Sequence, residues 1–336
     1  MTTSTSAGVG LAVLAGLMSG NCMLPSKFLR AWRWENMWAV FSLVSLIVLP
    51  CGLALGLVHH LPEIYESLSV AQLVAPIGFG MCWGVAQILF GISVDRLGLG
   101  LAYAIIVGMG AALGTLVPML TIGGGAFSRR TLVAVLLGIV LMAAGIALTT
   151  WSGRLRDGTN RAGIPPRRGY RASILLAIVC GLLAPMLNFS FAFGQEIAKQ
   201  SVAAGNSTLL ASYAVWPIGL AGGFVPNAGY ALYLLWRRGS WREFNRPSPD
   251  LLLSCAMAVL WMGAFSVYGM SAALLGTLGT SIGWGLFQIF MILAANLSGL
   301  LTGEWRTASV RARITLAAGM SLLIVATVLL TAANRS

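Results

Sequence analysis

The sequence predicts an all-α integral membrane protein whose ten transmembrane helices form two inverted five-helix repeats. Three observations predict this fold: the composition, a series of apolar segments of spanning length, and a short pattern that occurs in both halves. Of the 336 residues, 58% are hydrophobic and only 9% are charged. A soluble chain is roughly a quarter charged. So few charged residues could not cover the surface of a soluble protein. The composition therefore excludes a soluble domain.

Ten apolar segments follow one another along the chain, each near the roughly 20 residues that a spanning helix needs. They are 8–29, 37–58, 70–93, 98–120, 131–151, 172–197, 207–236, 251–271, 275–301 and 312–333. The first lacks a preceding basic region, so we expect it to be a span and not a cleaved signal peptide. The seventh contains Pro217, Pro226 and Gly222-Gly223, so we expect it to be kinked or interrupted.

Basic residues predict how these segments cross the membrane. Of the 21 lysines and arginines, 17 follow an odd-numbered segment. Basic loops stay in the cytoplasm, so both termini are expected on the outer side of the membrane. The net charge of +12 would point to nucleic acid in a soluble protein. Here the charges lie in short loops, so we expect contact with the cytoplasm and anionic lipid, and no nucleic-acid partner.

One pattern, Trp-x7-Gly-x5-Leu-Gly, occurs twice about half a chain apart. The copies are Trp83, Gly91, Leu97, Gly98 and Trp261, Gly269, Leu275, Gly276. Each begins in the third segment of its half and ends at the fourth. Five is an odd number of spans, so the second half must insert in the opposite sense to the first. We therefore expect a first repeat at 1–151, a basic cytoplasmic linker at 152–171 and a second repeat at 172–336.

Further short motifs follow a recognisable order along nearly the whole chain. They are Trp32 to Trp38, Ile47 to Pro50, Trp83-Gly84, Leu97-Gly98, Gly114 to Leu116, Cys180-Gly181, Tyr268-Gly269 and Gly303-Glu304-Trp305. In this order the chain resembles the drug/metabolite transporter superfamily and, more closely, its bacterial L-rhamnose–proton symporter family. The resemblance implies uptake of a 6-deoxyhexose with a proton. Asn188 to Gly194 and Pro50-Cys51 depart from the family pattern, so a related sugar or glycoside stays open.

A sugar site needs amides or hydroxyls that replace water, and flat aromatic faces that meet C–H groups. Trp83 and Gln87 share one helical face, and Trp284 repeats that spacing with Gln288. The predicted substrate-binding residues are Trp83, Gln87, Asn188, Trp261, Tyr268, Trp284, Gln288, Asn21 and Trp38. The alternative is that tryptophans form an interfacial belt and amides join helices. We favour the belt for Trp32, Trp34, Trp151, Trp236, Trp241 and Trp305.

Proton coupling needs a group that gains and loses a proton, yet no acid lies near the centre of a predicted span. Glu196 is the deepest, and Glu35 lies among aromatic residues at the mouth of the second span. We take these two as the candidates. Their alternatives are local ion pairs: Glu196 with Lys199, and Glu35 with Arg30 or Arg33.

These features together predict a secondary active transporter in the bacterial inner membrane. We expect it to import a neutral sugar by proton-coupled alternating access, as a monomer, without cofactor or metal. No catalytic motif is present. The nearest alternative is an exporter, or an uncoupled or sodium-coupled facilitator, of another small metabolite. An enzyme acting on lipid-linked sugars would need clustered acids or histidines, and here these residues are scattered.

Overall fold

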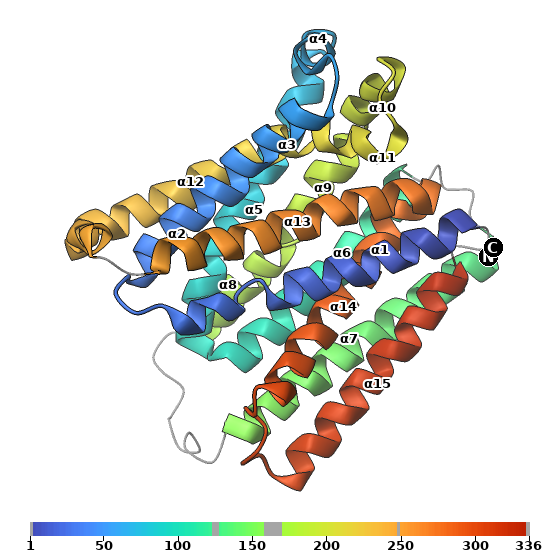
Figure 1. Ribbon diagram of the computed structural model, residues 1–336. Coiled ribbons are helices and arrows are strands. Elements are labelled where there is room, and N and C mark those ends of the chain that lie inside the picture. Colours follow the sequence, from blue (N-terminus) through green and yellow to red (C-terminus); the bar gives the residue numbers. More distant parts are fainter. Residues whose placement is uncertain (1–2, 123–127, 158–169, 247–248, 334–336) are drawn as a thin grey trace.

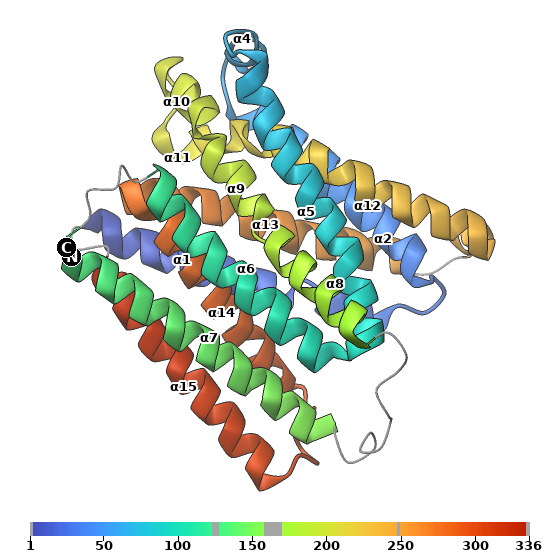
Figure 2. The same ribbon diagram turned by 180° about the vertical axis from the view of Figure 1, so that it is seen from behind.

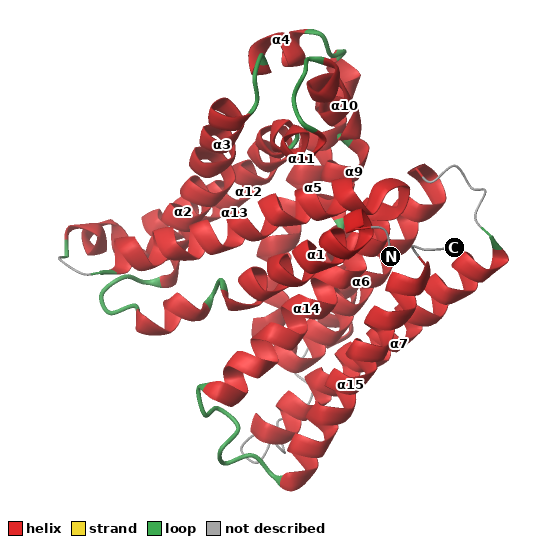
Figure 3. Ribbon diagram, turned by 45° about the vertical axis from the view of Figure 1, so that its right-hand side comes forward, coloured by secondary structure: helices red, strands yellow, loops and turns green. Residues whose placement is uncertain are grey.

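The computed structural model describes residues 3–122, 128–157, 170–246 and 249–333. Within these ranges the regular secondary structure is helical throughout (Figure 3). Nine stretches of the described chain are long and apolar enough to span a membrane. The longest, with 52 residues, contains two of the predicted segments as separate helices, α13 (Asp250–Leu275) and α14 (Gly279–Leu301).

Each predicted apolar segment is helical. Besides the two that form α13 and α14, four are single helices, as is the main part of the first, which continues into a short 3-10 turn. These helices are α1 (Thr3–Asn21) with η1 (Leu24–Phe28), α5 (Val70–Leu97), α6 (Leu99–Ile122), α7 (Arg129–Asp157) and α15 (Val310–Ala333). Because α7 runs to Asp157, it passes the predicted start of the linker at 152; residues 158–169 of that linker lie outside the described residues.

Three segments are divided into shorter helices. The second consists of α2 (Trp34–Leu43), the π-helical turn η2 (Val44–Val48) and α3 (Leu49–Leu57). The sixth consists of α8 (Tyr170–Leu183), α9 (Met186–Phe193) and α10 (Gln195–Ala203). Pro50 and Pro185 lie at these divisions, where the missing N–H of proline leaves a carbonyl of the preceding turn without its usual partner.

The seventh segment is interrupted, as the sequence predicts, but only near its start. It consists of α11 (Thr208–Ala211), the 3-10 turn η3 (Ser212–Ala214) and α12 (Trp216–Arg238). Pro217 occupies the first turn of α12, where its missing N–H costs nothing. The helix then continues through Pro226 without a break. The remaining short elements are α4 (Leu61–Glu66), η4 (Ser240–Asn245) and η5 (Gly276–Leu278).

The closing glycine of each repeated pattern separates two long helices. Gly98, between α5 and α6, has φ 79° and ψ 153°. Gly276, between α13 and α14, has φ 72° and ψ −140°. Residues with a Cβ atom rarely adopt such angles. The pattern therefore carries a structural requirement, a sharp reversal that only glycine makes without strain.

The packing joins the first half of the chain to the second. Helix α1 packs against α13 and α14, while α8 and α9 pack against α5 and α6. Helix α2 packs against α12 and α13, and α12 packs closely along α5. Helices α7 and α15 lie side by side along one flank of the molecule (Figures 1 and 2). This arrangement encloses the centre of the molecule with helices from both halves.

The crossing of α5 and α12 brings two backbones into direct contact. A Cβ atom on Gly80 would lie 1.8 Å from the carbonyl oxygen of Gly219, and one on Gly84 would lie 2.6 Å from that of Gly223. A Cβ atom on Gly222 would similarly meet the carbonyl oxygen of Ile77 at 2.1 Å. Small residues permit such close approach in membranes, where dispersion contacts replace the hydrophobic effect as the force between helices.

We predict that Gly80→Ala destabilises the fold, because its new methyl group has no room against the α12 backbone. The expected loss is about 1–3 kcal/mol of unfolding free energy. The measurement is the thermal unfolding midpoint of the purified protein in detergent. Gly78→Ala is the matched control, since a Cβ atom at this position of the same helix meets nothing within 4 Å. Equal midpoints for the two variants would contradict the close crossing.

Candidate functional site

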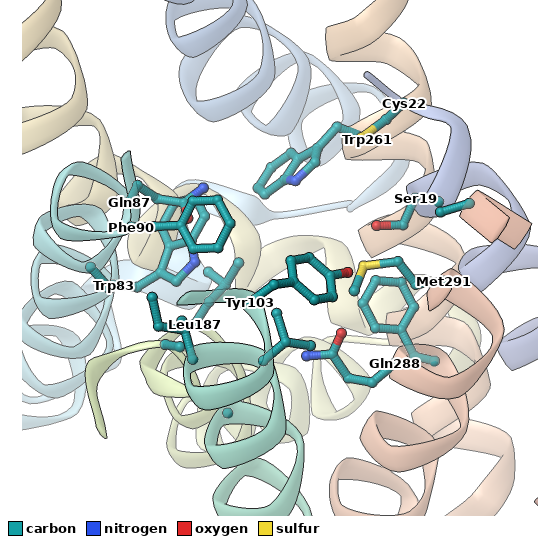
Figure 4. Close-up of a pocket in the computed structure, with 18 of the residues that line it drawn as sticks. Ser19, Cys22, Trp83, Gln87, Phe90, Tyr103, Leu187, Trp261, Gln288 and Met291 are labelled. Carbon is teal, nitrogen blue, oxygen red and sulfur yellow. The ribbon is translucent and has the colours of Figure 1, made fainter. Parts of the chain in front are cut away.

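A cavity of about 350 Å³ lies among α1, α5, α6, α8, α9, α13 and α14 (Figure 4). Among the 22 described residues that line it, none is Asp, Glu, Lys, Arg or His. Its polar atoms come from carboxamides, hydroxyls, thiols and indole N–H groups. A cavity with this lining suits a neutral solute, because a charged one would lose its hydration without gaining an opposite charge.

Five of the nine predicted substrate-binding residues line this cavity: Trp83, Gln87, Trp261, Trp284 and Gln288. Trp83 and Trp261, the tryptophans of the repeated pattern, stack with ring centroids 5.6 Å apart and an interplanar angle of 26°. Gln87 and Gln288 lie on opposite walls (Figure 4). The structure therefore brings together residues from α5, α13 and α14 that the sequence could only associate by spacing.

Gln288 lines the cavity and carries a hydrogen-bond acceptor that has no protein partner. Its side chain is only 8% exposed, and its Oε1 atom has no hydrogen-bond partner among the described residues. A buried polar atom without a partner costs about 1–3 kcal/mol. A ligand hydroxyl that donates to Oε1 would remove this cost. Gln288 is thus a lining residue whose side-chain oxygen no protein donor satisfies.

The neighbouring residues hold two of the tryptophan rings in place. The Nε1 atom of Trp284 donates to the backbone oxygen of Gly110 at 3.2 Å. The same ring lies so close to Gly114 that a Cβ atom there would be 2.2 Å from Nε1. Gly223 similarly contacts the Trp83 ring, with a virtual Cβ atom 2.9 Å from Cε3. Glycines behind the rings therefore fix the aromatic walls of the cavity.

Asn188 and Tyr268 are predicted site residues that lie outside the cavity lining. Both are fully buried, and the Tyr268 hydroxyl donates to Oδ1 of Asn188. The Asn188 amide group donates to the backbone oxygens of Gly114 and Thr280, each at 2.9 Å. These bonds join α9 and α13 to α6 and α14. For this pair the structure supports the alternative interpretation of the sequence, in which amide side chains join helices to one another.

Asn21 and Trp38 also lie outside the lining of the main cavity. The Oδ1 atom of Asn21 accepts from the Ser298 hydroxyl, and its amide group donates to the backbone of its own helix. Trp38 lines a smaller neighbouring pocket, and its Nε1 donates to Oδ1 of Asn227 at 3.1 Å. Asn21 thus joins α1 to α14, and Trp38 belongs to a separate hollow.

Sequence reasoning missed several residues of the cavity. Tyr103 projects into it from α6 (Figure 4), and Ser19 reaches it from α1 in place of the predicted Asn21. A signal for Tyr103 is present in the sequence, since it lies two helical turns before Gly110 on a segment that is otherwise almost entirely apolar. The other lining residues that were not predicted include Cys22, Phe90, Cys180, Phe265, Phe287 and Met291.

Glu35 is completely buried and has both carboxylate oxygens engaged. Arg238 donates to Oε2 at 2.9 Å, and the Ser240 hydroxyl donates to Oε1 at 2.7 Å. Its ionic partner is therefore an arginine of α12, not the Arg30 or Arg33 that the sequence alternative names. The pair joins α2 to the far half of the chain.

Glu196 forms the local pair that its alternative predicts. Lys199 donates to it at 3.1 Å, and the Gln200 amide group donates at 3.2 Å. The carboxylate side chain is 35% exposed. Its helix, α10, contributes no residue to the described lining of the cavity. The structure thus places this acid away from the cavity, with its carboxylate partly exposed.

Two other acids hold the loop that follows α1. Asp250 is fully buried and accepts from the backbone N–H groups of Arg30, Ala31 and Trp32 at 3.0, 2.7 and 2.7 Å. Glu304 accepts from Lys27, and the hydrogen bond and charge of that lysine lower the pKa of the Glu304 carboxyl group. Both acids are therefore structural.

A second cation adds to the group around Glu304. Arg156 donates to its carboxylate at 3.2 Å and also lies over the Trp305 ring, 4.8 Å from the centroid. The Gly303-Glu304-Trp305 motif thus joins the ends of α1, α7 and α14. This contact gives the motif a structural role at one end of the bundle.

The chain matches the family described as L-rhamnose-proton symport protein (RhaT) over residues 3–334. It is 28% identical over 328 residues to the L-rhamnose-proton symporter of Cronobacter sakazakii, and the match covers 93% of each chain. Proteins of the same name from Klebsiella pneumoniae subsp. pneumoniae and Escherichia coli strain 55989 are 26% and 27% identical, with coverage of 93% of this chain and 94% of theirs.

These relatives are bacterial, and the apolar helices of the described chain agree with a multi-pass protein of the inner membrane. The match extends through the helices that form the cavity and through both copies of the repeated pattern. The chain belongs to the L-rhamnose-proton symport protein family.

Proposed function

We propose that the protein imports a neutral sugar together with protons, as a secondary active transporter. The observation that carries this proposal is the uncharged cavity, with its tryptophan faces and its two carboxamides on opposite walls. The names of the relatives support proton-coupled sugar transport. The substrate class that we propose is a 6-deoxyhexose such as L-rhamnose, or a closely related sugar.

The cavity has the two kinds of surface that such a sugar needs. Trp83, Trp261 and Trp284 offer flat apolar faces for the C–H groups and the methyl group of the ring. Gln87 and Gln288 can exchange hydrogen bonds with hydroxyls on opposite edges. The unpaired Oε1 of Gln288 favours a ligand that donates at that point. This combination supports a polyhydroxylated neutral ring over a purely apolar metabolite.

We also propose ten membrane crossings in two inverted repeats, 1–151 and 172–336, joined by the linker 152–171. The start of α1 and the end of α15 lie at the same side of the molecule (Figures 1 and 3), which an even number of crossings explains. A continuous helix of 52 residues would extend about 78 Å. The hydrocarbon core is roughly 30 Å thick, so this stretch is better explained as two crossings.

The helix contacts support the inverted repeats. The first helix of the first half packs against the third and fourth helices of the second half: α1 against α13 and α14. In turn, α8 and α9 of the second half pack against α5 and α6 of the first. A two-fold axis in the membrane plane would exchange these contacts. Alternating access then follows as a rocking of the two halves about the shared cavity.

In the orientation that the basic loops favour, with both termini outside, the cavity faces the cytoplasm. The cavity residues of α1, α5 and α6 lie in the part of each helix that is nearer to a predicted cytoplasmic loop. Toward the other side lie the bonded pair Tyr268 and Asn188 and the stacked rings of Phe191 and Trp216, whose centroids are 4.5 Å apart. These contacts support an inward-facing state.

Of the two acids considered for proton coupling, we favour Glu35 over Glu196. Glu35 is fully buried, and its bond to Arg238 joins the two halves of the chain. Protonation would remove the charge that holds Arg238, so it could alter how the halves meet. Glu196 pairs with a residue of its own helix, where protonation changes only a local contact.

We predict that proteoliposomes containing the protein accumulate labelled L-rhamnose when an inward proton gradient is applied. Collapsing the gradient with a protonophore should reduce uptake to equilibration, because the sugar then loses its driving force. Protein-free liposomes are the control. Accumulation that ignores the proton gradient but follows a sodium gradient would replace the proton by sodium. Absence of transport across a panel of neutral sugars would contradict the proposed substrate class.

We predict that Gln288→Leu weakens L-rhamnose binding by about tenfold, because the ligand hydroxyl loses its acceptor and a hydrogen bond contributes about 0.5–1.5 kcal/mol. Equilibrium binding to the purified protein measures this change. Asn296→Leu is the matched control, since this amide lies on the same helix, bonds to its own backbone at 2.8 Å and does not line the cavity. Wild-type affinity in Gln288→Leu would remove this residue from the site.

We predict that Glu35→Gln abolishes gradient-driven accumulation, while exchange of labelled for unlabelled sugar continues. The amide keeps the shape of the side chain but cannot carry the proton. Glu196→Gln is the matched control and should accumulate sugar like the wild type. Proton-driven accumulation in Glu35→Gln, or its loss in Glu196→Gln, would reverse our choice between the two acids.

A further inference from the structure

A second pocket, of about 210 Å³, adjoins the main cavity. It lies between α2, α5 and α12, and it is lined by Trp34, Trp38, Ile88, Gly91, Ile92, Tyr230 and Leu234 together with Gln87 and Arg238. Gln87 lines both hollows, so a single side chain borders the two. The pocket is therefore a neighbour of the proposed sugar site and not a remote surface depression.

Aromatic rings form one wall of this pocket. Trp34 stacks on Trp38 with ring centroids 5.1 Å apart and an interplanar angle of 15°. Tyr230 meets Trp34 edge to face at 6.2 Å. The bond from Trp38 to Asn227 fixes one ring of the stack, while Trp34 is 43% exposed. The sequence interpretation assigned Trp34 to the interfacial belt, yet its ring belongs to a built aromatic wall.

The polar groups of the pocket provide hydrogen bonds without a net charge. Arg238 donates through Nη1 to Glu35, so its positive charge is balanced within the protein. A guanidinium group has five N–H donors, so the one bond to Glu35 leaves others for a ligand. Gln87 adds both a donor and an acceptor. Because the charge is balanced, an anionic headgroup or phosphate gains little electrostatic attraction here. Neutral hydroxyl groups can still accept hydrogen bonds from the N–H groups of the arginine.

We propose that this pocket is a second and weaker binding site for the transported sugar, occupied between the main cavity and the cytoplasm. The inference rests on the proposed function. Stacked tryptophans, a carboxamide and charge-balanced N–H donors repeat the chemistry of the main cavity at a smaller scale. The site binds more weakly because Trp34 is partly exposed, and because none of its lining residues has a buried oxygen left without a partner in the described structure.

Gly91→Leu tests the proposal by filling the pocket. A Cβ atom on Gly91 meets nothing within 4 Å, so the first atom of the larger side chain has room at a position that lines the hollow. Gly78→Leu is the matched control: it lies on the same helix, has equally open space and lines neither hollow. Trp34→Leu is a second variant that removes the aromatic wall, and it is compared with Trp241→Leu, whose ring is 49% exposed and lies outside both hollows.

The measurement is equilibrium binding of radiolabelled L-rhamnose to the purified full chain in lipid nanodiscs, over a wide concentration range. Wild type and both controls should show two classes of site per chain. Gly91→Leu and Trp34→Leu should keep the tighter class and lose the weaker one by at least tenfold in affinity. Gln288→Leu should weaken the tighter class and leave the weaker one in place.

One class of site in the wild type would overturn the second site and leave the proposed function standing. So would two unchanged classes in Gly91→Leu and Trp34→Leu. A phospholipid that co-purifies with the wild type and is released by Gly91→Leu would show a lipid occupant and overturn the inference as well. Failure of every neutral sugar to bind at either class would instead overturn the proposed function itself.

Discussion

A polar group that leaves water inside a membrane protein must find a partner, and this constraint organises the structure. Asp250 binds three backbone N–H groups, the carboxylate of Glu35 is held from both sides, and Asn188 bonds to two helices and a tyrosine. Each partner lies far away in the sequence, and the bonds of Asp250, of Glu35 and from Asn188 to Gly114 also join the first half of the chain to the second. Among the residues that line the main cavity, Gln288 is the only one with a buried side-chain oxygen that has no partner in the described part of the chain.

The scaffold is more symmetric than the site it encloses. The two copies of the repeated pattern end in glycines with similar positive φ angles, and their tryptophans stack on one another. The carboxamides do not follow this relation: Gln87 lies on the helix of the first tryptophan, but Gln288 lies on α14, the helix after the second. In the proposed arrangement, helices that correspond between the two halves can therefore surround an asymmetric sugar ring. Only the helices have to correspond, and the side chains that contact the sugar do not.

Sequence reasoning predicted the helical segments well because their signal is local: length, hydropathy and the positions of basic residues. It also found the cavity tryptophans and carboxamides, whose helical spacing marks a shared face. It could not predict partners that depend on tertiary packing. Glu35 and Arg238 are 203 residues apart, and nothing near Tyr268 in the chain indicates that Asn188 satisfies its hydroxyl. The division of the sixth segment at Pro185 also passed unnoticed, because the hydropathy continues across it.

The glycine contact between α5 and α12 has a kinetic consequence. Helices usually meet through side chains that interlock as ridges in grooves, and sliding one past the other requires those side chains to change rotamer together. Where Gly80 and Gly84 face Gly219 and Gly223, much of the meeting surface is backbone, and the nearest side chains of these two helices are the Pro226 ring at Gly84 and the Trp83 ring at Gly223. Such a surface offers low friction to a small rotation while still fixing the distance between the helix axes. A contact that tolerates no added methyl group thus also has few side chains that a small rotation would have to rearrange.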